Sequence, residues 1–233
     1  MQIYNIVPIF PKIGTLQFIS SYRNFLKYTL LYVEYNYFNK LVDYLINTKS
    51  LYAMDDSCSD EILKVYNKKL ENYLPVCIPN YKIPNNEFKT LSNQKSIRCC
   101  WLGRLDNEFK TPILNHIIKD LSNLSKEFDI HIILNIIGDG PGLELTKNIA
   151  NKHKNIKVNF LLTIQGDKLK KELINSDIGF AMGTSALEIA ALGIPTILLD
   201  ATYSVVPVSY TYRWLYEAKD YNLGYMMESY PIS

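Results

Sequence analysis

The sequence of 233 residues is poor in the features that mark several classes of protein. Its four cysteines, Cys58, Cys77, Cys99 and Cys100, show no C-x-x-C spacing and have no histidine nearby, so neither a zinc site nor a disulfide framework is expected. No uncharged apolar run approaches the roughly 18–20 residues that a transmembrane helix needs. The formal net charge of +2 is too small to indicate nucleic acid as a partner.

The start of the chain also lacks the features of a leader sequence. No basic residue precedes Pro8, and Pro8 and Pro11 interrupt the first apolar stretch, so no signal peptide is predicted. With 48% hydrophobic and 21% charged residues, the composition is that of a globular chain. We therefore expect a soluble, cytoplasmic protein in which Cys99 and Cys100, on opposite faces of one strand, are inert core thiols.

Glycine and histidine are nearly absent from the first part of the chain, which has Gly14 alone and no histidine up to residue 95. We predict that residues 1–95 form a shortened N-terminal domain with its linker and that residues 96–233 form a second domain. The elements expected in the first domain are an aromatic-rich helix near residues 20–47, a second helix capped by the acids Asp55 and Asp56, and a strand over residues 74–78.

The second domain alternates short apolar runs with segments of helical spacing. The predicted strands are residues 98–102, 130–137, 156–162, 178–182 and 196–200. The first predicted helix extends to residue 128, with Thr111 as its N-cap and Pro112 as its first helical residue. The other predicted helices are a segment that ends near residue 154, residues 168–175 and residues 185–192. Such an alternation requires right-handed crossovers and predicts a parallel, doubly wound α/β sheet.

Loops beyond the carboxyl ends of the strands are the candidate ligand site of such a sheet. Arg104 and Lys110 follow the first predicted strand and suit phosphate oxygens, the alternative being two solvated cations. Gly138, Gly140 and Gly142 follow the second strand. They either let the backbone approach a ligand closely or simply form a tight turn.

A third loop, residues 182–188, leads from the fourth predicted strand into a helix. Gly183 permits close approach, Thr184 and Ser185 offer hydroxyls, and a helix N-terminus suits an anion. Glu188, about one turn into the helix, can accept hydrogen bonds from sugar hydroxyls. The alternative is a capping box, in which Ser185 and Glu188 cap the helix without any ligand.

Four short segments of the second domain read WLGRLDNEFK at 101–110, IIGDGP at 136–141, IKVNF at 156–160 and LEIAALGIPTI at 187–197. In this order they resemble the C-terminal, donor-binding domain of GT-B glycosyltransferases, and most of all glycosyltransferase family 4. The resemblance extends over residues 97–200. It implies a Rossmann-like nucleotide-sugar-binding domain that follows a small or incomplete α/β first domain.

The resemblance also implies roles for particular residues. In that family the Arg and Lys after the first strand hold the diphosphate of a nucleotide-sugar, which implies this role for Arg104 and Lys110. The turn at residues 183–185 would add to the diphosphate site, and Glu188 would bind the nucleotide ribose. The backbone implied to contact the base is that of Leu162, Thr163 and Ile164.

A metal-independent transferase of the hexosyl type is implied, with a UDP- or GDP-sugar as co-substrate and no cofactor. The second domain accordingly has no D-x-D pair at a strand end. The first Glu of the family's E-x7-E motif lies near the transferred sugar, but here Phe180 stands eight positions before Glu188. No catalytic residue is assigned, because His116, His131 and His153 are expected to be structural or solvated.

The leading interpretation is a glycosyltransferase of polysaccharide biosynthesis, with a polysaccharide, a lipid-linked sugar or another glycan as acceptor. The alternative is a non-catalytic or split-enzyme module that binds the nucleotide-sugar and needs a partner subunit. An epimerase on the same fold would need acids and a histidine near the sugar, which we do not find. The apolar helix over residues 19–45 predicts a protein partner or a peripheral contact with the inner face of a membrane, unless it is ordinary core.

Overall fold

The computed structural model describes residues 22–78, 95–107 and 109–227. The chain divides into two compact units, Met1–Val76 and Cys77–Ser233. Residues 79–94, which precede the domain boundary expected at residue 95, lie outside the described residues, so that boundary stays a prediction. Each unit has a hydrophobic core of its own.

The first unit contains the two predicted helices, α1 (Tyr22–Asn47) and α2 (Asp56–Tyr66). Asp55 caps α2 as expected, since its Oδ1 accepts a hydrogen bond from the Cys58 N–H at 2.8 Å. The strand predicted over residues 74–78 is wrong, because these residues form no strand. Pro75 explains the difference, since it has no N–H to give to a ladder.

Helix α1 has both a core-facing side and an exposed apolar side over its described side chains, which begin at Tyr35. Val42 is buried, and Phe38 packs against the core of the first unit. Three apolar side chains at helical spacing are exposed, with exposed fractions of 65% for Tyr37, 36% for Leu41 and 64% for Tyr44. The described residues of the first unit therefore cover this helix only in part.

The second unit is the predicted doubly wound sheet. Its strands are β1 (Ser96–Leu102), β2 (His131–Ile137), β3 (Lys157–Leu162), β4 (Ile178–Ala181), β5 (Thr196–Leu198) and β6 (Arg213–Trp214). They lie in the order β3-β2-β1-β4-β5-β6. The pairs among β1 to β5 are parallel, and β6 joins β5 antiparallel. The five predicted strands are all present, and β6 is an edge strand that the sequence pattern did not indicate.

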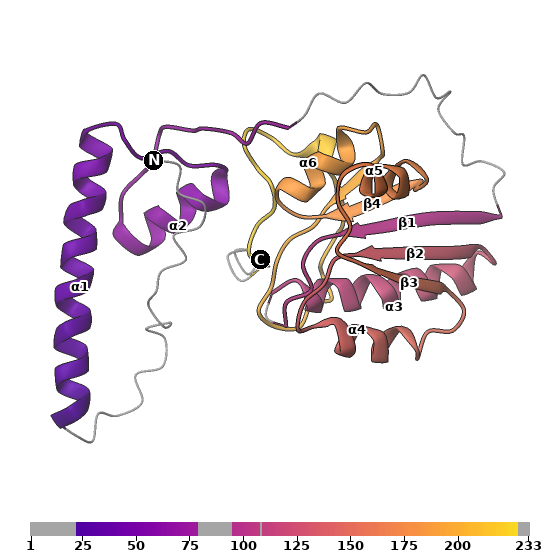
Figure 1. The fold of residues 1–233 in the computed structure, drawn as a ribbon. Coiled ribbons are helices and arrows are strands. Elements are labelled where there is room, and N and C mark those ends of the chain that lie inside the picture. Colours follow the sequence, from indigo (N-terminus) through magenta and orange to yellow (C-terminus); the bar gives the residue numbers. More distant parts are fainter. Residues whose placement is uncertain (1–21, 79–94, 108, 228–233) are drawn as a thin grey trace. The chain divides into compact units, whose positions relative to one another are not determined.

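Helices cover both faces of this sheet (Figure 1). The helices α3 (Thr111–Glu127) and α4 (Leu143–Ala150) lie on one face, and α5 (Gly166–Ile174) and α6 (Thr184–Ala190) lie on the other. Cys99 belongs to the core on the α3 side and Cys100 to the core on the α6 side, which confirms their opposite orientation. Both thiols are free, and burial raises their pKa to about 12 for Cys99 and about 11 for Cys100. They are inert at neutral pH.

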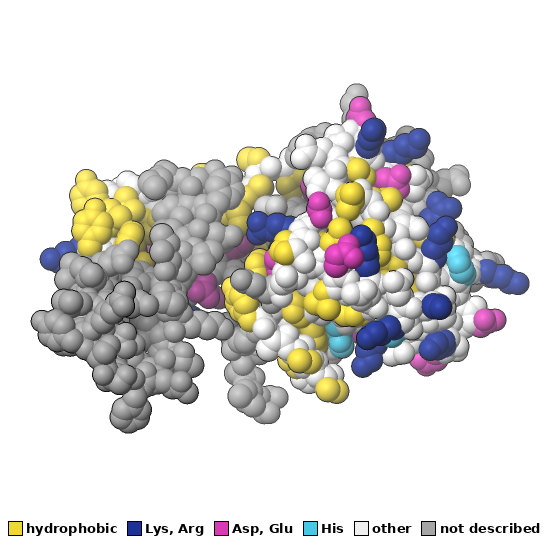
Figure 2. Space-filling view, turned by 60° about the horizontal axis from the view of Figure 1, so that its bottom comes forward, with side chains coloured by type: hydrophobic (Ala, Val, Ile, Leu, Met, Phe, Trp, Pro, Cys, Tyr) yellow, Lys and Arg dark blue, Asp and Glu magenta, His cyan; other side chains and the backbone are white. Residues whose placement is uncertain are grey.

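Charged side chains are spread over the second unit. On the face shown in Figure 2, Lys and Arg side chains are scattered with Asp and Glu between them rather than gathered in one stripe. Within the described ranges, no helix combines the length and the apolar character needed to cross a bilayer.

Candidate functional site

The two candidate anion-binding loops lie beside one another at the centre of the sheet. β1 and β4 are neighbours, paired in parallel with Trp101 opposite Phe180. From β1 the chain continues to β2 and β3 on one side, whereas β5 extends the sheet on the other side of β4. This reversal of strand order is a topological switch point, where ligands bind in doubly wound sheets. The Arg104–Lys110 loop follows β1 and the Gly183 turn follows β4.

Arg104 and Lys110 lie close enough to influence each other. Arg104 is exposed, and Lys110 is half-buried with its Nζ 5.6 Å from the centroid of the Phe109 ring. The pKa of Lys110 is lowered, first by burial and also by the positive charge of Arg104, while Asp106 acts in the opposite direction. A nearby anion would therefore favour the charged form of Lys110.

Asp106 shapes the loop that carries these cations. Its Oδ1 accepts hydrogen bonds from the backbone N–H groups of Phe109 at 2.9 Å and Lys110 at 3.0 Å. The Thr111 hydroxyl donates to the Asp106 carbonyl oxygen. Lys110 is therefore the N-cap residue of α3, and the prediction of Thr111 as N-cap is wrong by one position. The sequence reasoning overlooked Asp106, although an Asp shortly before a helix start is a known signal for such a turn.

The glycines after β2 support the loop after β1. The Leu105 N–H donates to the Asp139 carbonyl at 2.9 Å, and the Gly142 N–H donates to the Leu105 carbonyl at 2.8 Å. Gly138 has a φ of 146°, and a Cβ at this position would collide with the carbonyl oxygen of Gly103. The glycines thus allow backbone to pack directly on the backbone of the Arg104 loop, a purpose that neither sequence interpretation included.

The turn after β4 begins a helix that no side chain of the described residues caps. Gly183, with a φ of 61°, is the N-cap of α6, and its carbonyl accepts the Ala186 N–H at 3.2 Å. No side chain caps this helix, so the capping box of Ser185 and Glu188 does not form. Glu188 is half-buried one turn into α6, and none of the hydrogen bonds and ion pairs between described residues involves its carboxylate.

The segment predicted to contact a base lies apart from these two loops. Leu162 ends β3 with a φ of 52°, and Thr163 and Ile164 follow it. β3 is the edge strand, separated from β1 by β2. The structure therefore places this segment, like Arg104, beyond the carboxyl ends of the strands, but two strands away from β1.

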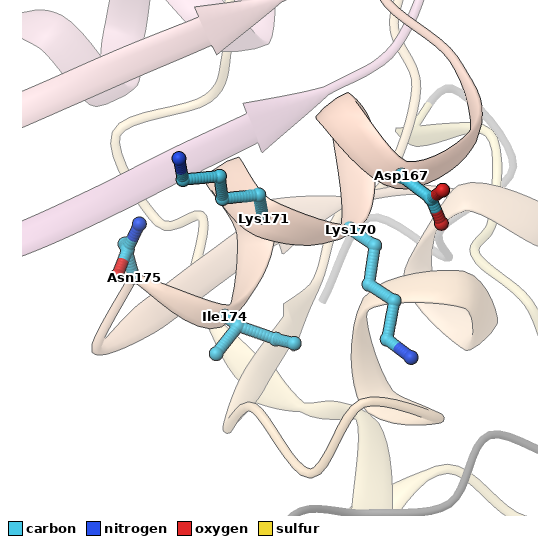
Figure 3. Close-up of a pocket in the computed structure, with 5 residues that line it drawn as sticks. All are labelled: Asp167, Lys170, Lys171, Ile174 and Asn175. Atoms are coloured by element: carbon cyan, nitrogen blue, oxygen red, sulfur yellow. The ribbon is translucent and has the colours of Figure 1, made fainter.

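Two shallow hollows lie along α5 rather than at the switch point. One, of about 290 Å³, includes Ile164, and the other, of about 320 Å³, is shown in Figure 3. The second is lined by Asp167, Lys170, Lys171, Ile174 and Asn175. Neither includes Arg104, Lys110 or Glu188, so neither is the candidate site.

The three histidines have partners of their own. His131 lies at the amino end of β2, with Nδ1 3.4 Å from the Ser96 hydroxyl, and His153 Nδ1 is 3.0 Å from the Ser122 hydroxyl. His116 Nε2 lies 3.1 Å from a carboxylate oxygen of Asp120. Nowhere in the described part of the chain do three or more His, Cys, Asp or Glu side chains gather to hold a metal ion.

Comparison with known proteins adds the family. The family model described as "Glycosyl transferases group 1" matches residues 82–210, more than half of the chain, including both loops of the candidate site. The chain belongs to this family. The resemblance to a GT-B glycosyltransferase is thereby confirmed, and the narrower assignment to family 4 stays a prediction.

Among solved structures, this group 1 chain is similar to the apo form of the lipopolysaccharide outer core galactosyltransferase WaaB. The TM-score is 0.46 at 15% identity, over 75% of this chain and 47% of that one. The chain thus spans less than half the length of that structure. A search of the curated proteins finds no match.

Proposed function

We propose that this protein transfers a sugar from a UDP- or GDP-sugar to a polysaccharide, a lipid-linked sugar or another glycan, without a metal ion. The observation that carries the proposal is the placement of Arg104 and Lys110 together at the switch point of a group 1 glycosyltransferase domain. A guanidinium offers a planar pair of donors to one phosphate, and an ammonium is a mobile point charge for the other.

The chemistry asks mainly for positioning and charge. The bond between the anomeric carbon and the diphosphate breaks, and its electron pair stays on the diphosphate. The oxygen of the acceptor hydroxyl forms the new bond to the anomeric carbon, and its proton passes to solvent. Arg104 and Lys110 stabilise the charge that develops on the leaving diphosphate. Thr184 and Ser185 add backbone N–H groups, and Glu188 orients the donor by accepting hydrogen bonds from the ribose.

Titration calorimetry with UDP and GDP in the presence of a chelator tests the diphosphate site. We expect binding of at least one of them, and Arg104→Gln or Lys110→Gln should weaken it about ten- to hundredfold, the range for a charge-assisted hydrogen bond. Lys147→Gln is the matched control, because Lys147 is paired with Glu144 on the surface of α4. Affinity that appears only with magnesium or manganese would contradict the metal-free site.

The same titrations, carried out on the variant Glu188→Gln, test the contact with the ribose. Glu188→Gln retains the shape of the side chain and removes its charge, so affinity should fall while the thermal midpoint stays unchanged, since Glu188 caps no helix. Unchanged affinity would remove Glu188 from the site. Release of UDP or GDP from the nucleotide-sugars, with and without glycan acceptors, then distinguishes a transferase from a binding module that needs a partner subunit.

The first unit would bind the membrane in which a lipid-linked acceptor lies. The exposed face of α1 carries Tyr37, Leu41 and Tyr44, with the exposed Lys40 among them. Such a surface suits the acidic inner face of a membrane, where a lipid-linked acceptor resides. The proposal therefore includes peripheral contact with the cytoplasmic side of a membrane.

A further inference from the structure

The segment that follows β5, residues 200–227, contacts both loops of the candidate site. We call this segment the strap. The Thr202 N–H donates to the Phe109 carbonyl at 3.2 Å, directly beside Lys110. The Gly183 N–H donates to the Leu223 carbonyl at 2.8 Å. One continuous segment thus holds the loop after β1 and the turn after β4.

A largely buried ion pair within the strap joins its first residue to β6. Arg213 Nη2 donates to Asp200 Oδ1 at 2.6 Å and to Asn222 Oδ1 at 3.1 Å. The Asp200 side chain is 2% exposed and that of Arg213 24%. The guanidinium carbon lies 4.8 Å from the centroid of the Tyr225 ring. Arg213 therefore joins three points of the strap at one planar group, which a lysine could not do.

The acceptors of Arg213 also bind the backbone next to Leu223. Asp200 Oδ1 accepts the Tyr225 N–H at 2.8 Å, and Asn222 Oδ1 accepts the Gly224 N–H at 3.2 Å. The Leu223 carbonyl, which accepts the Gly183 N–H, thus belongs to a residue that lies between Asn222 and Gly224, two members of this network. A loss of Arg213 would leave Asp200 buried without its cation, which is strongly unfavourable, and would free this stretch of backbone to move.

We propose that Arg213 is a positioning residue of the donor site. By its ion pair with Asp200 it keeps the strap in place, and the strap keeps the Gly183 turn and the Lys110 loop at the separation that a diphosphate requires. The proposal rests on the proposed function of these two loops. A buried ion pair adds little stability compared with an apolar pair of the same shape, so its value here lies in the geometry it imposes.

Hydrogen exchange of the unliganded protein tests the network without any nucleotide. In Arg213→Met, and in the milder Arg213→Lys, the amides of Gly183 and Thr202 should exchange at least tenfold faster than in the original protein. The control is Ile132→Ala, which removes a buried side chain near the amino end of β2 and so lowers stability at the end of the strand away from the two loops. The proposal is overturned if both amides exchange as slowly in Arg213→Lys as in the original protein. It is also overturned if they lose their protection equally in the control.

Calorimetry with UDP and GDP on the same three variants tests the consequence for binding. We expect at least a tenfold loss of affinity in both Arg213 variants and none in Ile132→Ala at a comparable thermal midpoint. Faster exchange with unchanged affinity would show that the strap does not position the site. If the original protein binds neither nucleotide, the proposed function fails. The exchange experiment still shows separately whether Arg213 holds the two loops through the strap.

Discussion

Lys110 lies in an environment that disfavours its own charge. Partial burial is the main cause of its lowered pKa, and the nearby Arg104 adds to it, while Asp106 favours the charged form. Asp106 is already engaged, because its Oδ1 holds the start of α3. A bound diphosphate would supply the countercharge that Asp106 supplies only in part, so the same features that depress the pKa make this lysine responsive to an anion.

This environment predicts how nucleotide affinity depends on pH. A bound diphosphate raises the pKa of Lys110, so affinity is full below the pKa of the free protein and falls as pH rises through it. Because that pKa is lowered from the ordinary value of 10.5, the loss should begin at a lower pH than for an ordinary lysine. Titration of UDP or GDP at a series of alkaline pH values measures it.

Lys110→Arg is the control for this prediction, since a guanidinium remains charged throughout the range. Its affinity should be flat over the same pH values. An alkaline loss of equal size in Lys110→Arg would assign the titration to a different group.

At the scale of the elements, the site depends on how two loops pack on each other. The glycine-rich loop between β2 and α4 lies directly against the Arg104 loop, with Gly138 on Gly103 and Gly140 on Leu105. This contact between backbones leaves no room for a side chain. The shape of the cation loop is thus determined by a neighbouring loop as much as by its own residues.

Gly138→Ala should therefore disturb both stability and binding. The collision with Gly103 and the φ of 146° together should cost about 3 kcal/mol or more in the free energy of unfolding. Gly166→Ala is the matched control, with a φ of 61° but open space around the position, and should cost about 1 kcal/mol. Urea denaturation gives both values. Equal costs for the two variants would show that the close packing is unimportant.

The sequence predicted the elements of the second unit well and their contacts less well. The strand His131–Ile137 has one buried face and a mostly half-buried second face, and it produces an almost continuous apolar run that local patterning reveals. Gly138 and Arg213 act through partners distant along the chain, which no local pattern indicates. Asp106 instead acts on its near neighbours Phe109 and Lys110, so its position before the helix is a local signal that the prediction overlooked. The strand predicted over residues 74–78 failed for a local reason, because its apolar character outweighed Pro75 in the prediction.

At the scale of the molecule, the chain joins two units of different kinds. The second unit contains the parallel sheet and the whole segment matched by the family model. The described part of the first unit has two helices and one isolated bridge, between Ala53 and Tyr73. Its core covers one side of α1 and leaves Tyr37 and Tyr44 mostly in solvent.

The exposed side of α1 should bind anionic membranes. In co-sedimentation with vesicles rich in phosphatidylserine, Leu41→Glu should reduce the bound fraction several-fold, because the new charge repels the surface and the apolar contact is lost. Leu63→Glu is the control, a similarly exposed leucine on α2 of the same unit. A protein that stays in the supernatant with these vesicles would contradict the prediction, and gel filtration with light scattering would then show whether the same face joins two copies.

The pairing of β1 with β4 also determines the order in which the sheet can assemble. β1 pairs with β2 and β2 with β3 through short crossovers, whereas Cys99 of β1 must find Ile178 of β4 across all the residues between them. Long-range pairs form slowly because a large loop must close first. During synthesis from the N-terminus, the backbone N–H and C=O groups along one edge of β1 therefore stay unpaired until β4 is made. A chain interrupted before residue 178 would keep that edge, and the central strand of the finished sheet would become a site of aggregation.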